Sequence, residues 1–268
     1  MTISTLRSQD MLLCAHDITF RVINNDGPAL QEAFRLRYKI YCQEKKYLSK
    51  DGYSADLEMD EYDHNSIHIG AFDQKGSLLG YARLVLPHWK KRLPMHQQCS
   101  FFPPQTAFSN SRYLQSAGCA EISRIVVRKD VRAQEQGRLL KFFRRYFGRT
   151  KFYKSIKSLR SLLSGRICVA LGLYKMILFV AEQENINHLL AVIEKPYARH
   201  LKFYNVHFQQ IGPFFDYGGA VAPHIIDARA TQRSFCRNNR LLHWYFFRYI
   251  RASDKKDLAV PSLPEIAA

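Results

Sequence analysis

The pattern of apolar and polar residues along the chain predicts strands that are separated by helices. Alternation of the two kinds of residue predicts strands over residues 17–24, 66–72, 77–86, 121–128, 188–194, 206–211 and 214–221. Apolar residues at helical spacing predict helices over 28–43, 135–147, 169–184 and 196–204, and 87–118 is expected to be mainly loop. This order indicates an α+β (α/β layered) fold, with helices on both faces of a mixed sheet.

The length of 268 residues suits one large domain with short additions at its ends. We expect a flexible leader over 1–16, a main domain over 17–228 and a basic, aromatic extension over 229–268. No stretch approaches the roughly 20 apolar residues of a membrane-spanning helix, and no signal-peptide pattern precedes the first strand. A cytoplasmic location is therefore expected, and peripheral attachment to the inner membrane stays open.

Charged side chains stand where the pattern predicts apolar ones. Arg37 lies on the same helical stripe as Phe34 and Tyr41, and Arg83 and Arg124 lie inside predicted strands. A buried charge without a partner is very costly, so these guanidinium groups are expected to meet carboxylates.

Four acids are the candidate partners. Glu58, Asp60 and Asp63 form E-x-D-x-x-D before a predicted strand, and Glu121 opens the strand that holds Arg124. Strand alternation places Glu121 and Arg124 on opposite faces unless a bulge rotates one of them. These charges are either structural ion pairs or a polar site built on the sheet.

The net charge of +17 is unevenly distributed. Residues 128–175 hold 14 Lys and Arg against two acids, residues 229–256 hold eight against one, and residues 51–63 hold six acids and no base. Such basic surfaces predict an anionic partner: nucleic acid, anionic lipid or an acidic protein. No helix-turn-helix, zinc-finger or RNP-like motif is present, which argues against nucleic acid. The six cysteines are scattered without metal-binding spacing, so no metal is expected.

Four motifs in order resemble the signature of acyl-homoserine lactone synthases: R-x-x-x-[FY] at 37–41, E-x-D-x-x-D at 58–63, Arg83-Leu84 in a strand, and E-x-S-R at 121–124. The C-terminal half resembles N-acyl amino acid synthases and the acyltransferases associated with PEP-CTERM/exosortase systems, through 171–174, 188–194, 212–213, 217–218 and Pro223. The resemblance spans about 18–228. It implies a GNAT fold, whose central twisted sheet splays at a thioester cleft.

The resemblance implies an N-acyltransferase that moves a fatty acyl group from acyl carrier protein or coenzyme A to the amine of an amino acid. Lactone synthases usually carry a tryptophan shortly after the first helix, and here Tyr47 or Leu48 stands nearby. This departure favours an amino acid over S-adenosylmethionine as the amine. A homoserine lactone synthase stays the alternative, and an inactive GNAT fold used as a binding module is another.

The resemblance also assigns roles, because acyl transfer needs a base, a stabilised oxyanion and an acid for the thiolate. Glu121 is the expected base, or else an ion-pair partner of Arg37 or Arg83. Tyr204, in a segment similar to the GNAT pattern at 198–208, is expected to protonate the thiolate, or else only to pack on the sheet. The other expected site residues are Arg37, Glu58, Asp60, Asp63, Arg83 and Arg124 for the amine substrate, and Val126, Val127 and Arg128 for the thioester and pantetheine.

The segment after Arg128 bears on the donor. Coenzyme A-dependent GNAT enzymes usually carry R/Q-x-x-G-x-G/A there to cradle a pyrophosphate, and residues 134–139 hold only one glycine. With the basic stretch 138–166, this favours acyl carrier protein, whose phosphopantetheine would be the only prosthetic group involved. The extension 229–268 is expected to pack on the domain, or alternatively to lie on an anionic membrane.

Overall fold

The computed structural model describes residues 11–15, 18–87, 92–102, 118–131, 165–203, 206–238 and 248–251. Its strands form one sheet in the order β10-β1-β2-β3-β4-β5-β6-β9-β7, and β8 pairs with β9 beside this path. β5 and β6 are parallel and the other neighbours are antiparallel. The strands are β1 (Met11–Ala15), β2 (Ile18–Val22), β3 (Ser66–Phe72), β4 (Leu78–Val85), β5 (Cys119–Val127), β6 (His188–Glu194), β7 (Gln209–Gln210), β8 (Phe215–Asp216), β9 (Ala220–Asp227) and β10 (Arg248–Arg251).

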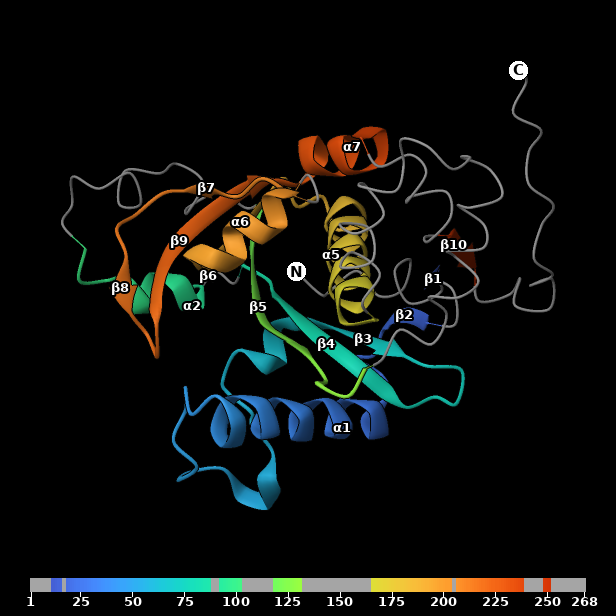
Figure 1. The fold of residues 1–268 in the computed structure, drawn as a ribbon, viewed down its shortest axis with the longest axis horizontal. Coiled ribbons are helices and arrows are strands. Elements are labelled where there is room, and N and C mark those ends of the chain that lie inside the picture. The colour runs from blue at the N-terminus through green and yellow to red at the C-terminus, as the bar shows by residue number, and fades with distance from the viewer. Residues whose placement is uncertain are drawn as a thin grey trace, which may run out of the picture.

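Helices cover both faces of this sheet, as the sequence predicted. α1 and α5 lie on opposite sides of the strands (Figure 1). The helices are α1 (Gly27–Tyr38), the π-helix η1 (Lys39–Glu44), α2 (Pro94–Gln98), α5 (Gly165–Gln183), α6 (Lys195–Phe203) and α7 (Ala228–Asn238), with short 3₁₀ turns η2 (Ser54–Asp56) and η3 (Asp63–Asn65). The α+β fold expected from the order of elements is confirmed.

α1 begins where the sequence provides a cap. The side chain of Asp26 accepts a hydrogen bond from the backbone N–H of Ala29 at 3.1 Å, and Pro28 occupies the first turn. At its other end α1 continues directly into η1, and such widened turns are frequent at functional sites. Here the widened turn carries Tyr41 and leads to Tyr47, which both face the cavity described below.

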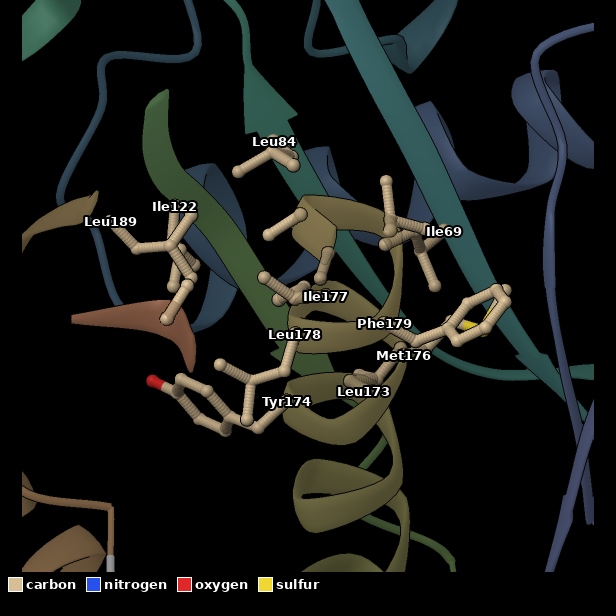
Figure 2. Close-up of a cluster of buried hydrophobic side chains, with 14 of the residues drawn as sticks. Ile69, Leu84, Ile122, Leu173, Tyr174, Met176, Ile177, Leu178, Phe179 and Leu189 are labelled. Carbon is tan, nitrogen blue, oxygen red and sulfur yellow. The ribbon is translucent and has the colours of Figure 1, made fainter. Parts of the chain in front are cut away.

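α5 forms the centre of the largest hydrophobic core. Its side chains are buried on nearly all sides because the sheet covers one side of the helix and α7 contacts it as well. Figure 2 shows Leu173, Ile177 and Leu178 of α5 against Ile122 of β5. Each such burial contributes roughly 1.5–3 kcal/mol. No helix in the described part of the chain is long and apolar enough to cross a bilayer.

A glycine permits the close packing of α5 on the sheet. A Cβ atom at Gly172 would stand 2.0 Å from the Phe20 ring of β2. That distance is well inside van der Waals contact, so any larger residue here would push α5 away from the sheet.

The structure corrects several of the predicted elements. Residues 214–221 are not one strand: Gly218 and Gly219, with φ of 69° and 154°, turn the chain between β8 and β9. β9 then runs to Asp227 and pairs with β6 from Val221 to Asp227. α2 lies inside the segment 87–118 that was expected to be loop. The predicted helix 135–147 lies outside the described residues.

Both ends of the chain contribute strands to the sheet. Residues 11–15, expected to belong to a flexible leader, form β1, which pairs with β2 and with β10. Residues 248–251 of the C-terminal extension form β10, and 228–238 form α7. The leader prediction is therefore wrong for 11–15, because the backbone groups of β1 have partners on both sides.

Candidate active site

The two parallel strands at the centre of the sheet separate from each other part of the way along. β5 pairs with β6 only from Cys119 to Glu121, opposite His188 to Leu190. Beyond Glu121, β5 continues to Val127 and β6 continues to Glu194 without further pairing to each other. A cavity of about 680 Å³ occupies the gap between them. We call this cavity the cleft.

The cleft passes through the sheet and is lined from both of its faces. On one face α5 and α6 supply Arg166, Tyr174, Tyr197 and His200 among the lining residues. On the other face η1, the segment after it and α2 supply Tyr41, Lys45, Tyr47, Leu48, Pro94 and Gln98. Two reactants could therefore meet in the plane of the sheet after entering from opposite sides.

The charged residues singled out in the sequence form a closed ring beside the cleft. Three arginines and three acids alternate around it, and every member contacts two members of the opposite charge. The order around the ring is Arg37, Glu58, Arg124, Asp60, Arg83, Asp63 and back to Arg37. The sequence predicted the charged partners, and their common arrangement appears only in the folded chain.

Arg37 and Arg83 are the two arginines of the ring that are almost completely buried. The side chains of Arg37 and Arg83 are 0% and 1% exposed. Arg37 donates to Glu58 and holds Asp63 with both Nη atoms, at 2.6 and 3.2 Å. Arg83 holds Asp60 in the same bidentate way, at 2.5 and 2.9 Å, and also donates to Asp63. Neither of the two arginines lines the cleft.

The pKa values of two acids of the ring, Asp60 and Asp63, are lowered for a physical reason. Burial alone would raise the pKa of Asp63, but Arg37 and Arg83 outweigh burial and hold that pKa at about 2. Asp60 is shifted in the same direction by Arg83 and Arg124, again against burial. Three arginines face three carboxylates, so the formal charges of the ring cancel.

A bulge in β5 brings Arg124 into the ring. Arg83 stands opposite Ser123 and Tyr81 stands opposite Val126, so two residues of β5 face one residue of β4. The backbone of Arg124 accommodates the bulge with a φ of 53°, which is rare for a residue with a side chain of this size. Strand alternation alone would place Arg124 with Ile122 against α5. The bulge turns it to the face of Glu121 instead, so the opposite-face expectation is wrong.

Arg124 is the ring member that reaches the cleft. It donates to Glu58 at 3.0 Å and to Asp60 at 3.2 Å through Nη2, its guanidinium lies 5.4 Å from the Tyr41 ring centroid, and its side chain is 15% exposed. Nη1 makes no ion pair with the residues that the structure describes. One edge of this guanidinium is therefore directed at the cleft.

Glu121 occupies the apex of the cleft, at the last paired position of β5. Its carboxylate accepts a hydrogen bond from the backbone N–H of Met95 in α2 at 2.7 Å, and the residue is 2% exposed. Burial raises the pKa of Glu121 from 4.5 to about 7, against the opposing effects of the Met95 N–H and of Arg83 and Arg124. Within the described ranges it makes no ion pair with Arg37 or Arg83, so the alternative sequence interpretation as a partner of these arginines has no contact to support it.

The remaining expected site residues are divided between the cleft and its surroundings. Val126 and Val127 line the cleft, on the edge of β5 that β6 has left. Arg128 does not: its N–H donates to the Leu79 carbonyl at 2.9 Å, and its guanidinium pairs with Asp130. Tyr204 and the segments 134–139 and 138–164 lie outside the described residues, so the expected acid and the expected phosphate loop are not located.

Several cleft residues were not predicted as site residues. Tyr174 and Tyr197 both line the cleft on the α5–α6 face, and burial raises the pKa of Tyr197 to about 12. Tyr47 and Glu194 meet on the opposite face at 2.9 Å. Residues of these types at a strand end or on a helix carry no distinctive spacing, so no signal in the sequence singled out their contacts.

Comparison with known proteins supports the family indicated by the motifs. Residues 36–141 match the family model described as Acetyltransferase (GNAT) domain. No curated protein matches the chain significantly by sequence. The fold is similar to that of MesI, a CoA-dependent acyl-homoserine lactone synthase, with TM-score 0.51 at 17% identity over 81% of this chain and 90% of that one.

Two further solved structures are similar. The AHL synthase LasI has TM-score 0.50 at 16% identity, over 85% of this chain and 95% of its own. FeeM, an N-acyl amino acid synthase from uncultured soil microbes, has TM-score 0.46 at 16% identity, over 81% and 94%. At these identities the likeness to MesI and LasI concerns the fold. The GNAT fold expected from the sequence is confirmed.

Proposed function

Because this chain carries a GNAT acetyltransferase domain, we propose that it is an N-acyltransferase that moves a fatty acyl group from a thioester to the amine of an amino acid. The observation that carries the proposal is Glu121, a buried carboxyl with a pKa of about 7, at the apex of a cleft that is lined from both faces of the sheet. A group with this pKa can take a proton from an ammonium at neutral pH.

Glu121 acts as the general base in this reaction, directly or through one water molecule. It accepts a proton from the ammonium, and the amine nitrogen then attacks the thioester carbon. The carbon–sulfur bond breaks as the tetrahedral intermediate collapses, the attacking nitrogen gives up its second proton to water, and the thiolate takes up a proton, so the products are an amide and a thiol. The free backbone edge of β5 at Val126 and Val127 is placed to bind the pantetheine and the acyl oxygen.

Tyr204 is our proposed proton donor to the thiolate. α6 ends at Phe203, directly before Tyr204, and the same helix borders the cleft through Tyr197 and His200. Tyr204 is therefore close in sequence to residues that line the cleft on the α5–α6 face, where we propose below that the acyl donor binds.

Arg124 binds the carboxylate of the amino acid in this proposal. Of the three arginines, Arg37 and Arg83 are enclosed by acids and lie away from the cleft, whereas Arg124 lines it with one edge uncommitted. The other five members of the ring then act as positioning residues that hold Arg124 and its bulge in place. A guanidinium held in this way needs little further ordering when it binds a carboxylate.

The donor proposed is an acyl carrier protein that docks on the α5–α6 face. Among the described residues, the exposed Arg166 lines the cleft on this face. α6 borders the cleft through Tyr197 and His200, contains no acid and carries the exposed side chains of Lys195, Arg199 and Lys202. An acidic carrier protein would complement that surface, and its single phosphodiester would not need a full pyrophosphate cradle. Coenzyme A is the competing donor, and MesI is described as CoA-dependent.

A salt titration tests the donor. We expect transfer from acyl carrier protein to be faster than from the matching acyl-CoA, with a kcat/KM that falls roughly tenfold or more between low and high salt because docking is electrostatic. Product formation is followed by mass spectrometry with a panel of amino acids and, separately, with S-adenosylmethionine. Equal, salt-insensitive rates with both donors would argue for coenzyme A. A lactone product would move the assignment to a homoserine lactone synthase.

A second measurement tests the role of Arg124. Arg124→Lys keeps the charge but loses the planar fork, so we expect KM for alanine to rise about 10-fold or more. Ethylamine, which is alanine without the carboxylate, provides the matched comparison, and its kcat/KM should not change. A variant that loses activity equally toward both amines would assign Arg124 a structural role only.

A further inference from the structure

Tyr47 crosses the open end of the cleft and joins the two halves of the sheet. Its backbone N–H donates to the Tyr41 carbonyl at 2.8 Å, which anchors it to the end of η1 on the β1–β5 side. Its hydroxyl donates to Glu194 at 2.9 Å, at the far end of β6 on the other side. Burial and the nearby Glu194 both raise the pKa of Tyr47, so the hydroxyl stays protonated and able to donate.

The turn between β8 and β9 packs on the phenol ring of Tyr47. A Cβ atom at Gly218 would stand 2.7 Å from Cδ1 of Tyr47, and Gly218 has φ of 69°, so the position suits only glycine on both counts. The Tyr41 ring, 6.3 Å away, and the Lys45 ammonium, 5.7 Å from the ring centroid, enclose the other sides. Tyr47 is therefore held by four residues from three parts of the chain: Tyr41 and Lys45 at η1, Glu194 at the end of β6, and Gly218 in the turn.

We propose that Tyr47, tied to Glu194, is the residue that limits the size of the amine substrate. Both side chains line the cleft on the face of η1 and α2, where the Met95 N–H holds Glu121 and where Arg124 lies. The amine therefore meets this wall in the arrangement proposed above, on which the inference rests. The amine's side chain then occupies the space between the phenol ring and β5, whose residues 121–127 line the cleft.

The position of this wall depends on the hydrogen bond between Tyr47 and Glu194 as well as on the phenol ring of Tyr47. Without the hydroxyl, the hydrogen bond between the η1 segment and the end of β6 is lost. The Tyr47 side chain is then less firmly held, and so is the turn at Gly218 that packs on it. Glu194 acts in this proposal only as the hydrogen-bond acceptor of the Tyr47 hydroxyl, and the hydrogen bond does not need its negative charge. The charge and the hydrogen bond can therefore be separated by substitution.

The test compares four variants on a panel of glycine, alanine, leucine, phenylalanine and tryptophan with one acyl thioester. Tyr47→Ala should raise kcat/KM for tryptophan relative to glycine by about 10-fold or more, since steric exclusion of this kind is worth that much. Tyr47→Phe should give a smaller shift, roughly three- to tenfold, because one hydrogen bond is lost. Glu194→Gln keeps an acceptor oxygen and should retain the wild-type ranking. Tyr53→Ala, a half-buried tyrosine of the same segment that does not line the cleft, is the matched control.

Amide hydrogen exchange in residues 216–220 provides a readout that needs no substrate. Exchange should speed up in Tyr47→Ala and less in Tyr47→Phe, and should match wild type in Glu194→Gln and Tyr53→Ala. If Tyr47→Ala leaves both the ranking of amines and the exchange unchanged, the inference is wrong. It is equally overturned if Glu194→Gln alone raises KM for the amine, since Glu194 would then contact the substrate itself. If the wild-type protein acylates no amine in the panel, the proposed function is refuted. If the variants still show the expected differences in exchange, the structural link between Tyr47 and Glu194 is nevertheless supported.

Discussion

Replacement of Glu121 by glutamine is expected to lower kcat for acyl transfer by about 10²–10⁴-fold, the range typical of a lost general base. Glutamine has nearly the same shape and can still accept the hydrogen bond from the Met95 N–H. The substitution therefore removes the proton acceptor and leaves the packing. Glu182→Gln, the same change at an exposed position of α5, should have no effect. A Glu121→Gln variant with near wild-type kcat would exclude this carboxyl as the base.

The same variant should be more stable than wild type at alkaline pH. The pKa of Glu121 is raised in the folded state, so folding favours the protonated form, and stability is lost as pH rises from about 4.5 through about 7. Each pKa unit corresponds to about 1.4 kcal/mol, so Glu121→Gln should gain roughly 1–3 kcal/mol at pH 8. Urea unfolding at pH 5 and pH 8 measures this. A partner in an ion pair would give the opposite result, since its loss would lower stability.

The activity of wild type should follow the same ionisation. kcat/KM should fall as pH drops below about 7, because Glu121 becomes protonated and cannot accept a further proton. Asp63 does not contribute to this window, since its pKa is about 2, and Arg83 lowers the pKa of Asp60 as well. A profile that stays flat down to pH 5 would contradict the assignment.

Replacement of Arg37 by alanine is expected to lower the free energy of unfolding by about 3–5 kcal/mol. Arg37 is 0% exposed and neutralises Glu58 and Asp63, so its removal leaves an excess of negative charge in the interior. This loss is a large fraction of the stability of a typical domain, and poor yield of soluble protein is part of the expected result. Urea unfolding at pH 7 is the measurement.

Arg21→Ala is the matched control for that experiment. Arg21 also forms an ion pair, with Asp26 at 2.6 Å, but both side chains are about one-third exposed (31% and 33%). Solvent screens such pairs, so the loss should stay below about 1 kcal/mol. Equal losses in the two variants would show that the ring contributes no more than a surface pair does.

Much of the fold could be predicted because hydrophobic periodicity is local. β3 and β6 have the predicted bounds, and α1, β4, β5, α5 and α6 lie within a few residues of theirs. The errors concern contacts between distant segments. β1 is a strand because β2 and β10 lie on its two sides, and β9 is long because β6 supplies partners from Val221 to Asp227.

The ring of charges also separates what the local sequence predicts from what contacts between distant segments decide. Arginines and acids at apolar positions could be identified from the sequence, because an unpaired buried charge is too costly to persist. Which carboxylate meets which guanidinium could not, since 20 or more residues separate the partners along the chain. The bulge at Arg124 was named only as a condition, because alternation describes a regular strand and a bulge interrupts it.

The sequence by itself determined the order of the elements, the apolar core and the set of charged residues that must pair, because periodicity and the cost of burying charge act at the level of the residue. The tertiary structure decided the rest: where β5 and β6 part, which face Arg124 takes, that Glu121 stands in the cleft beside the Met95 N–H rather than an arginine, and that Tyr47 reaches Glu194. Each of these depends on the distance and burial of groups far apart in the chain, and such quantities exist only once the chain has folded.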